Sequence, residues 1–146
     1  PYKGKFTPDN PNKYMGDDDN IIYRSGWERR AMKYFDINPG VLKWASEEVV
    51  IPYYDSVSKK VRRYFPDFLI KVQTAEGSTQ THLIEVKPSK DLRPPVGGRG
   101  KKKSTVLYEM KTYRMNQDKF AAARKWCDDR NIIWDVWTEK QLKQKG

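Results

Sequence analysis

The order in which helical and strand-like patterns follow one another constrains this fold more than any other feature of the sequence. Apolar residues at helical spacing come first, followed by strand-like stretches at 41–54, 61–72 and 81–87. A long helical pattern at 106–130 and a last strand at 132–137 come next, and a short helix closes the chain. The order α-β-β-β-α-β-α predicts an α/β fold in which a mixed sheet is flanked by helices.

Capping and turn residues place the boundaries of these elements. Ser25 is expected to cap the first helix, with Glu28 completing a capping box, and Asn38-Pro39-Gly40 is expected to end it. The polar turn 55–59 predicts a hairpin between the first two strand-like stretches. One apolar face of the long helix is expected to hold Val106, Met110, Tyr113, Phe120 and Cys127.

Residues 1–22 differ in composition from the rest of the chain. They are rich in Pro, Asn, Asp and Lys and lack periodic apolar residues. This pattern predicts an extended N-terminal arm, anchored by Tyr2, Phe6 and Tyr14. Residues 23–146 are expected to form one domain, because a chain of 146 residues has the length of a single domain.

The chain carries a large excess of positive charge. It has 29 Lys and Arg against 19 Asp and Glu, a formal net charge of +10. Between Lys87 and Lys125, 12 basic residues stand against 3 acidic ones, so nearly all of the excess lies in that segment. A polyanionic partner is therefore expected, and nucleic acid is the commonest.

Cysteine and histidine are too few for several kinds of site. Cys127 is the one cysteine, which excludes an intramolecular disulfide and a cysteine-ligated metal cluster and favours a reducing compartment. His82 alone excludes a multi-histidine zinc site. An RNA-binding module is disfavoured, because the sequence has no RNP-type aromatic motif or KH-type glycine loop. The sequence has no membrane-length apolar run and no signal-peptide pattern, so no membrane association or export is expected.

The loop at 88–104 is long for a compact domain and contains the run Arg99-Gly100-Lys101-Lys102-Lys103. The lysines of this run are expected to neutralise phosphates without reading bases. The alternative is a solvated loop without a ligand. The residues expected to contact DNA are Lys90, Arg93, Arg99, Lys101, Lys102, Lys103, Lys111 and Arg114.

Two short motifs carry the candidate chemistry, Phe65-Pro66-Asp67-Phe68 and Ile84-Glu85-Val86-Lys87. Side chains alternate between the faces of a strand, so Glu85 and Lys87 project from the same side. If the second and third strands are neighbours, Asp67 lies close to Glu85. Charged groups within apolar strands are costly to bury without a use.

A pair of carboxylates beside a lysine suits the hydrolysis of phosphodiesters. The carboxylates supply the oxygen ligands that magnesium prefers, and manganese is expected to substitute. The cation would polarise the phosphoryl oxygen and acidify a bound water, while the lysine either orients that water or stabilises developing charge. The alternative for Asp67, Glu85 and Lys87 is a structural ion pair at a strand end.

These motifs resemble the PD-(D/E)XK signature of the restriction-endonuclease-like superfamily, whose core order is also α-β-β-β-α-β. Pro66-Asp67 matches its first part and Glu85-Val86-Lys87 its second. The resemblance implies that Asp67 and Glu85 bind the metal, that the Val86 carbonyl is a further ligand and that Lys87 is catalytic. Members often place another acidic residue on the first helix, which implies Glu28 as a fourth catalytic and metal-binding residue.

Two residues keep competing interpretations. Glu28 could serve only the capping box, and one geometry is not expected to serve both roles. Gln117 interrupts the apolar face of the long helix. It is either a residue that supports the site, as the resemblance implies, or one at an exposed or boundary position.

Within the superfamily, the strings at 23–28 and 86–90 resemble two groups, the transposon end-cleaving endonucleases and the head-completion nucleases of contractile-tailed phages. The resemblance implies a magnesium-dependent DNA nuclease that acts in phage head completion or DNA-end processing, in the host cytoplasm or the virion. It implies DNA, other head or neck proteins and a second copy in a homodimer as partners. The alternative is a non-catalytic DNA-binding virion protein that keeps the nuclease fold.

Overall fold

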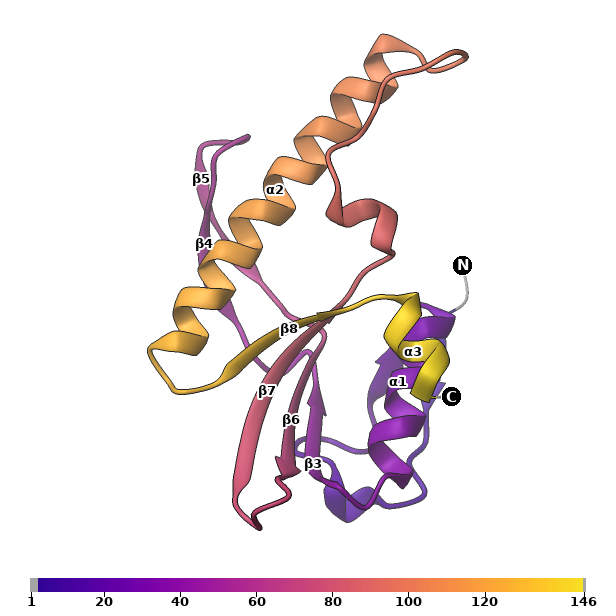
Figure 1. Ribbon diagram of the computed structural model, residues 1–146, viewed down its shortest axis with the longest axis vertical. Coiled ribbons are helices and arrows are strands. Elements are labelled where there is room, and N and C mark those ends of the chain that lie inside the picture. The colour runs from indigo at the N-terminus through magenta and orange to yellow at the C-terminus, as the bar shows by residue number, and fades with distance from the viewer. Residues whose placement is uncertain (1–2, 146) are drawn as a thin grey trace.

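A four-stranded sheet forms the centre of the computed structural model, which describes residues 3–145 (Figure 1). Its strands lie in the order β3 (Val41–Ser46), β6 (Phe68–Gln73), β7 (Thr79–Val86) and β8 (Ile133–Trp137). β6 is antiparallel to both of its neighbours, and β8 runs parallel to β7. The expected α/β fold with a mixed sheet is confirmed.

Helices cover both faces of this sheet. α1 (Gly26–Ile37) and α3 (Glu139–Lys145) lie on one face, and α2 (Lys103–Asp128) lies on the other (Figure 1). Two short 3-10 helices span Pro11–Lys13 and Ser89–Leu92. No helix within residues 3–145 is long and apolar enough to cross a lipid bilayer.

The caps expected at the two ends of α1 are present, and α3 also has an N-terminal cap. The Ser25 Oγ accepts a hydrogen bond from the Glu28 amide at 3.1 Å, and Asn38 is the C-cap of α1. The Thr138 Oγ1 accepts one from the Lys140 amide at 3.2 Å, at the start of α3. These side chains satisfy backbone donors that the first turn of a helix leaves free.

Two further strands, β4 (Ile51–Asp55) and β5 (Lys60–Tyr64), form a separate antiparallel ribbon. The expected hairpin turn joins them, but the prediction of one strand each for 41–54 and 61–72 is wrong. Both stretches divide between the ribbon and the main sheet, the first of them after Glu47, which has a left-handed φ of 55°. Alternating apolar residues predict a strand but do not identify its sheet.

The segment before α1 lies against the rest of the domain. β1 (Gly4–Phe6) pairs with β2 (Ile21–Tyr23), and the expected boundary between residues 22 and 23 falls inside β2. Phe6 and Tyr14 act as the expected anchors, since both rings make T-shaped contacts with Trp44. Tyr2, the third expected anchor, lies outside the described residues.

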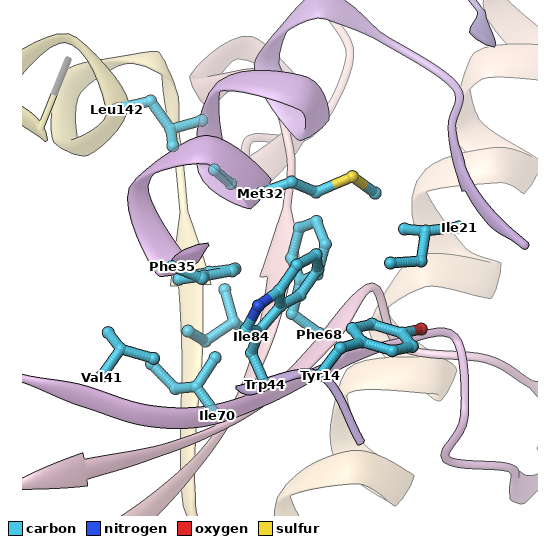
Figure 2. Packing of buried hydrophobic residues seen from close by; sticks show 11 residues of the cluster. Tyr14, Ile21, Met32, Phe35, Val41, Trp44, Phe68, Ile70, Ile84 and Leu142 are labelled. Atoms are coloured by element: carbon cyan, nitrogen blue, oxygen red, sulfur yellow. The ribbon is translucent and has the colours of Figure 1, made fainter. Parts of the chain in front are cut away.

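An aromatic core fills the space between the sheet and α1. Trp44 and Phe68 project from the sheet toward Phe35 of α1, and all three side chains are fully buried (Figure 2). The Phe35 and Phe68 rings pack edge to face at 5.0 Å. A core this rich in large rings buries much apolar area from few positions, which suits a chain of this charge.

The two halves of α2 have different surroundings. Phe120 and Cys127 in the second half are buried, whereas Met110 in the first half is 54% exposed. The prediction of one continuous apolar face is therefore wrong for the first half. Figure 1 shows that half projecting beyond the sheet, with the loop between β7 and α2 beside it.

Candidate active site

Asp67 and Glu85 come together because β6 and β7 are neighbours. Phe68 pairs with Ile84, and the Val86 amide donates a hydrogen bond to Asp67 Oδ2 at 2.8 Å. The expected adjacency of the two strands is thus present. The hydrogen bond fixes the Asp67 carboxylate against the end of β7.

Glu85 and Lys87 lie on one side of β7, with Lys87 Nζ 3.6 Å from Glu85 Oε2. The Tyr64 hydroxyl donates a hydrogen bond of 2.6 Å to Glu85 Oε1. Glu85 is only 6% exposed, so this bond and the lysine are its compensation for burial. Tyr64 has no counterpart among the predicted site residues.

A further carboxylate, that of Glu47, lies beside Asp67 and was not predicted from the sequence. Oxygen atoms of Glu28, Glu47 and Asp67 all lie within 4.8 Å of one another. Glu47 follows the end of β3 and has a left-handed φ. Its carboxylate accepts hydrogen bonds from Arg24 Nε at 2.9 Å and from Arg24 Nη2 at 3.1 Å. The pair Glu47-Glu48, directly after β3, was the sequence signal that could have pointed to this residue. The alternation of strand residues ends before this pair, so it does not predict where the two side chains point.

Glu28 lies at the start of α1 and also in the carboxylate cluster. Its carboxylate accepts hydrogen bonds from the Arg24 amide, one residue before the N-cap, at 3.3 Å and from the Ser25 hydroxyl at 3.4 Å, while one oxygen lies in the cluster. The role of Glu28 as a metal ligand stays a prediction.

The cluster holds more negative charge than its surroundings neutralise. Burial, and then the charge of Glu85, hold the pKa of Asp67 well above its usual range. Burial likewise raises the pKa of Glu85 and of Glu28, and the neighbouring Glu47 raises that of Glu28 further. A hard divalent cation fits such a set, because several close carboxylate oxygens are its preferred ligands and its charge would relieve their repulsion.

α2 contributes Asn116 and Lys119 to the site. Lys119 is half-buried, and burial and the charge of Lys87 lower its pKa. Gln117, by contrast, is exposed, so the interpretation of it as a supporting residue is wrong and its exposed alternative holds. Asn116 and Lys119 lie one and two positions from Gln117. Only half of α2 packs against the sheet, so its apolar pattern does not fix which of these neighbouring residues faces inward.

A hollow of about 890 Å³, here called the basic groove, opens next to Lys87. It is lined by loop residues between Lys90 and Lys101 and by α2 residues between Tyr108 and Lys119. Of the residues predicted to contact DNA, Lys90, Arg93 and Lys101 line it.

The other residues of the predicted DNA-binding set lie outside the basic groove. Arg99, Lys102, Lys103 and Lys111 are exposed elsewhere on the loop and on α2. Arg114 donates to Ser56 Oγ at 3.0 Å and lies 3.6 Å from Asp118, which ties α2 to the turn of the β4–β5 ribbon.

Comparison with known proteins finds a matching family and a similar protein. Residues 38–139 match the family described as the TnsA-like endonuclease N-terminal domain. Over 148 aligned residues the chain is 38% identical to the head completion nuclease of Enterobacteria phage T4, covering 99% of this chain and 96% of that protein. Asp67, Glu85 and Lys87 all lie inside the region that matches the family.

Proposed function

The chain belongs to the TnsA-like endonuclease family, and from that premise we propose that it is a magnesium-dependent DNA nuclease. The observation that carries this proposal is the convergence of Asp67, Glu85 and Lys87, since Lys87 lies beside Glu85 and also lines the basic groove. Carboxylates and a lysine at the end of a phosphate-binding surface suit the hydrolysis of a phosphodiester.

We propose that Asp67, Glu28 and Glu85 hold the metal, with the Val86 carbonyl as a further ligand, and we add Glu47 to that set. When bound, the cation would polarise the phosphoryl group and lower the pKa of an attacking water. Arg24 Nε lies 2.9 Å from Glu47 Oε1, so Arg24 offsets part of the negative charge of this set and would share Glu47 with a bound cation.

The remaining side chains would hold and orient these groups. Lys87 Nζ is placed to stabilise charge that develops on the phosphate, since it lies beside the carboxylates at the groove. Tyr64 fixes Glu85 through its hydroxyl, and the Val86 amide fixes Asp67. Lys119 adds positive charge at the same end of the groove.

The proposed setting is phage head completion, because the phage T4 relative carries that description and aligns over nearly the whole chain. A nuclease there would process a DNA end in the host cytoplasm or in the virion. Other head or neck proteins and a second copy of the chain belong to the same proposal as partners.

Cleavage assays with linear and circular DNA test the activity. We expect cleavage with magnesium, weaker or similar cleavage with manganese, and none with EDTA. Asp67→Asn and Lys87→Ala should abolish it, whereas Glu76→Gln should not, because Glu76 is exposed in the turn at the far end of the same hairpin. Cleavage that persists in Asp67→Asn would falsify the proposed site.

The same assays address the alternative of a non-catalytic DNA-binding protein. Binding of DNA without cleavage across divalent metals would support that alternative and overturn the enzyme. A titration of the unmodified chain with magnesium, followed by intrinsic fluorescence, gives a readout that is independent of turnover.

A further inference from the structure

We propose that the basic groove binds a single DNA strand, and that the preferred substrate therefore carries an unpaired end or flap. This inference rests on the proposed DNA nuclease for the cutting step, but strand binding in the groove can be measured without it. The size of the groove, the charge at its walls and two tyrosines on α2 support the inference.

The loop wall and the helix wall of this open groove are joined to each other. Lys101 Nζ lies 2.9 Å from Glu109 Oε1 and donates to the Val96 carbonyl at 3.3 Å, so the loop is fastened to α2 across the hollow. Its volume of about 890 Å³ falls in the range of sites for single small molecules, about 300–1,000 Å³. A few nucleotides of one strand fit such a space.

Positive charge follows the groove toward the active site. Five basic side chains line the groove against two acidic ones, Asp91 and Glu109. Lys90, Arg93 and Lys101 lie on its loop wall, and Lys87 and Lys119 lie at the end next to Glu85. Phosphates of a strand lying there would be neutralised along the way. The same strand would reach Lys87, which lies 3.6 Å from Glu85.

The α2 wall presents aromatic rings to the same space. Tyr108 and Tyr113 line the groove, and Tyr108 is 71% exposed. A large ring on a helix half that packs against no core is a platform for stacking an unpaired base, and a paired base offers no such face from within a duplex. Tyrosines interleaved with lysines are the composition of sequence-independent single-strand sites.

Fluorescence anisotropy of the unmodified chain in EDTA tests the proposal. The probes are labelled oligo-dT, a blunt duplex, and the same duplex with an oligo-dT overhang at either end. We expect oligo-dT and an overhang duplex to bind more tightly than the blunt duplex. Tyr108→Ala should weaken those two by about fivefold to a hundredfold, the loss of one stacked base, and leave the blunt duplex unchanged.

Two controls separate stacking from a general effect. Tyr108→Phe should retain the affinity for oligo-dT, because it keeps the ring. Tyr54→Ala should have no effect, because Tyr54 is similarly exposed, at 57%, but lies on β4 outside the groove. Circular dichroism is expected to show both alanine variants folded.

The proposal is overturned if the blunt duplex binds as tightly as the overhang duplexes, or if Tyr108→Ala binds oligo-dT as the unmodified chain does. Tighter binding of oligo-rU than of oligo-dT would overturn it in favour of RNA. Failure of the nuclease is distinguishable, because a chain that binds overhangs through Tyr108 but cuts nothing with magnesium would lose only the proposed function.

Discussion

The two faces of β7 bury side chains of different kinds, apolar on one face and charged on the other. Ile84 and Val86 project into the aromatic core beneath α1, where the largest side chains are apolar and fully buried. Glu85, between them, projects to the α2 side and is buried beside Tyr64 and Lys87. Neighbouring residues on one strand therefore belong to a stability face and to a chemical face.

The difference shows how a small domain can hold a costly site. Close carboxylates with raised pKa values oppose folding of the metal-free protein, and the aromatic core on the other face supplies the compensating burial. Substitutions on the apolar face should consequently lower stability and leave the cleavage rate largely unchanged. Substitutions on the charged face should lower the cleavage rate and leave stability largely unchanged. The predictions below test that separation.

The largest expected effect is on the chemical face. Lys87→Ala removes the group that stabilises developing charge, and we expect cleavage to fall by about 10³-fold or more. The melting temperature should fall by only about 2–4 °C, because Lys87 is part of neither apolar cluster although its charge offsets the burial of Glu85. Single-turnover cleavage and differential scanning fluorimetry measure the two quantities. A loss of activity matched by a loss of folding would contradict the separation.

On the stability face, Ile84→Ala should cost about 3 kcal/mol of unfolding free energy, because it opens a cavity in a fully buried site. Urea denaturation measures it. At a temperature where the variant stays folded, its cleavage rate should remain within about tenfold, since the strand itself is retained. Glu76→Gln serves again as the exposed control. An Ile84→Ala variant that is folded at the assay temperature but does not cleave DNA would show that the two faces are coupled.

The sequence predicts part of this separation and misses another part, for identifiable reasons. Glu85 and Lys87 were predictable, because alternation along a strand places them on one face whatever the partner strands are. Asp67 required only that β6 and β7 be neighbours, and consecutive strands usually are.

Glu47 was not predictable in the same way. It follows β3 in a left-handed conformation, where no periodicity tells which way a side chain points. Likewise, the split into β4 and β5 depends on which strands pair, and the apolar pattern of a strand carries no record of its partner. Lys119 and Asn116 were missed because a helix packed along only half its length gives a weak phase for its faces.

A smaller effect is expected from the loop on the chemical side. Reversing the charges of Lys101, Lys102 and Lys103 should weaken DNA binding by about tenfold to a hundredfold at moderate salt and flatten its salt dependence. The unfolding free energy should change by less than about 1 kcal/mol, because all three are exposed and the Lys101–Glu109 pair lies at the surface. Anisotropy titrations at several salt concentrations check this. A matched reversal at Lys33, Lys60 and Lys71, which are distant in sequence from the loop, should have less effect; equal effects would mean that only net charge matters.

The smallest effect tests whether the carboxylate cluster opposes folding. Because burial raises the pKa of Asp67 in the folded protein, the folded state holds protons more tightly than the unfolded one. The contribution of this group to stability is therefore greatest when the carboxyl is protonated, at acidic pH, and is lost as the pH rises through the folded-state pKa. In EDTA at neutral pH, Asp67→Asn should thus be more stable than the unmodified chain, by about 1 kcal/mol, with the difference shrinking toward pH 4.

Magnesium should reverse this order, because only the unmodified chain gains from metal binding to the folded state. Thermal melts across pH, with and without magnesium, measure both signs in one experiment. The Asn side chain can still accept the hydrogen bond from the Val86 amide, so the substitution changes charge more than packing. If Asp67→Asn were less stable in EDTA at every pH, the carboxylate would be a structural ion-pair partner rather than part of a strained metal site, and the contrast between the two faces of β7 would lose its physical basis.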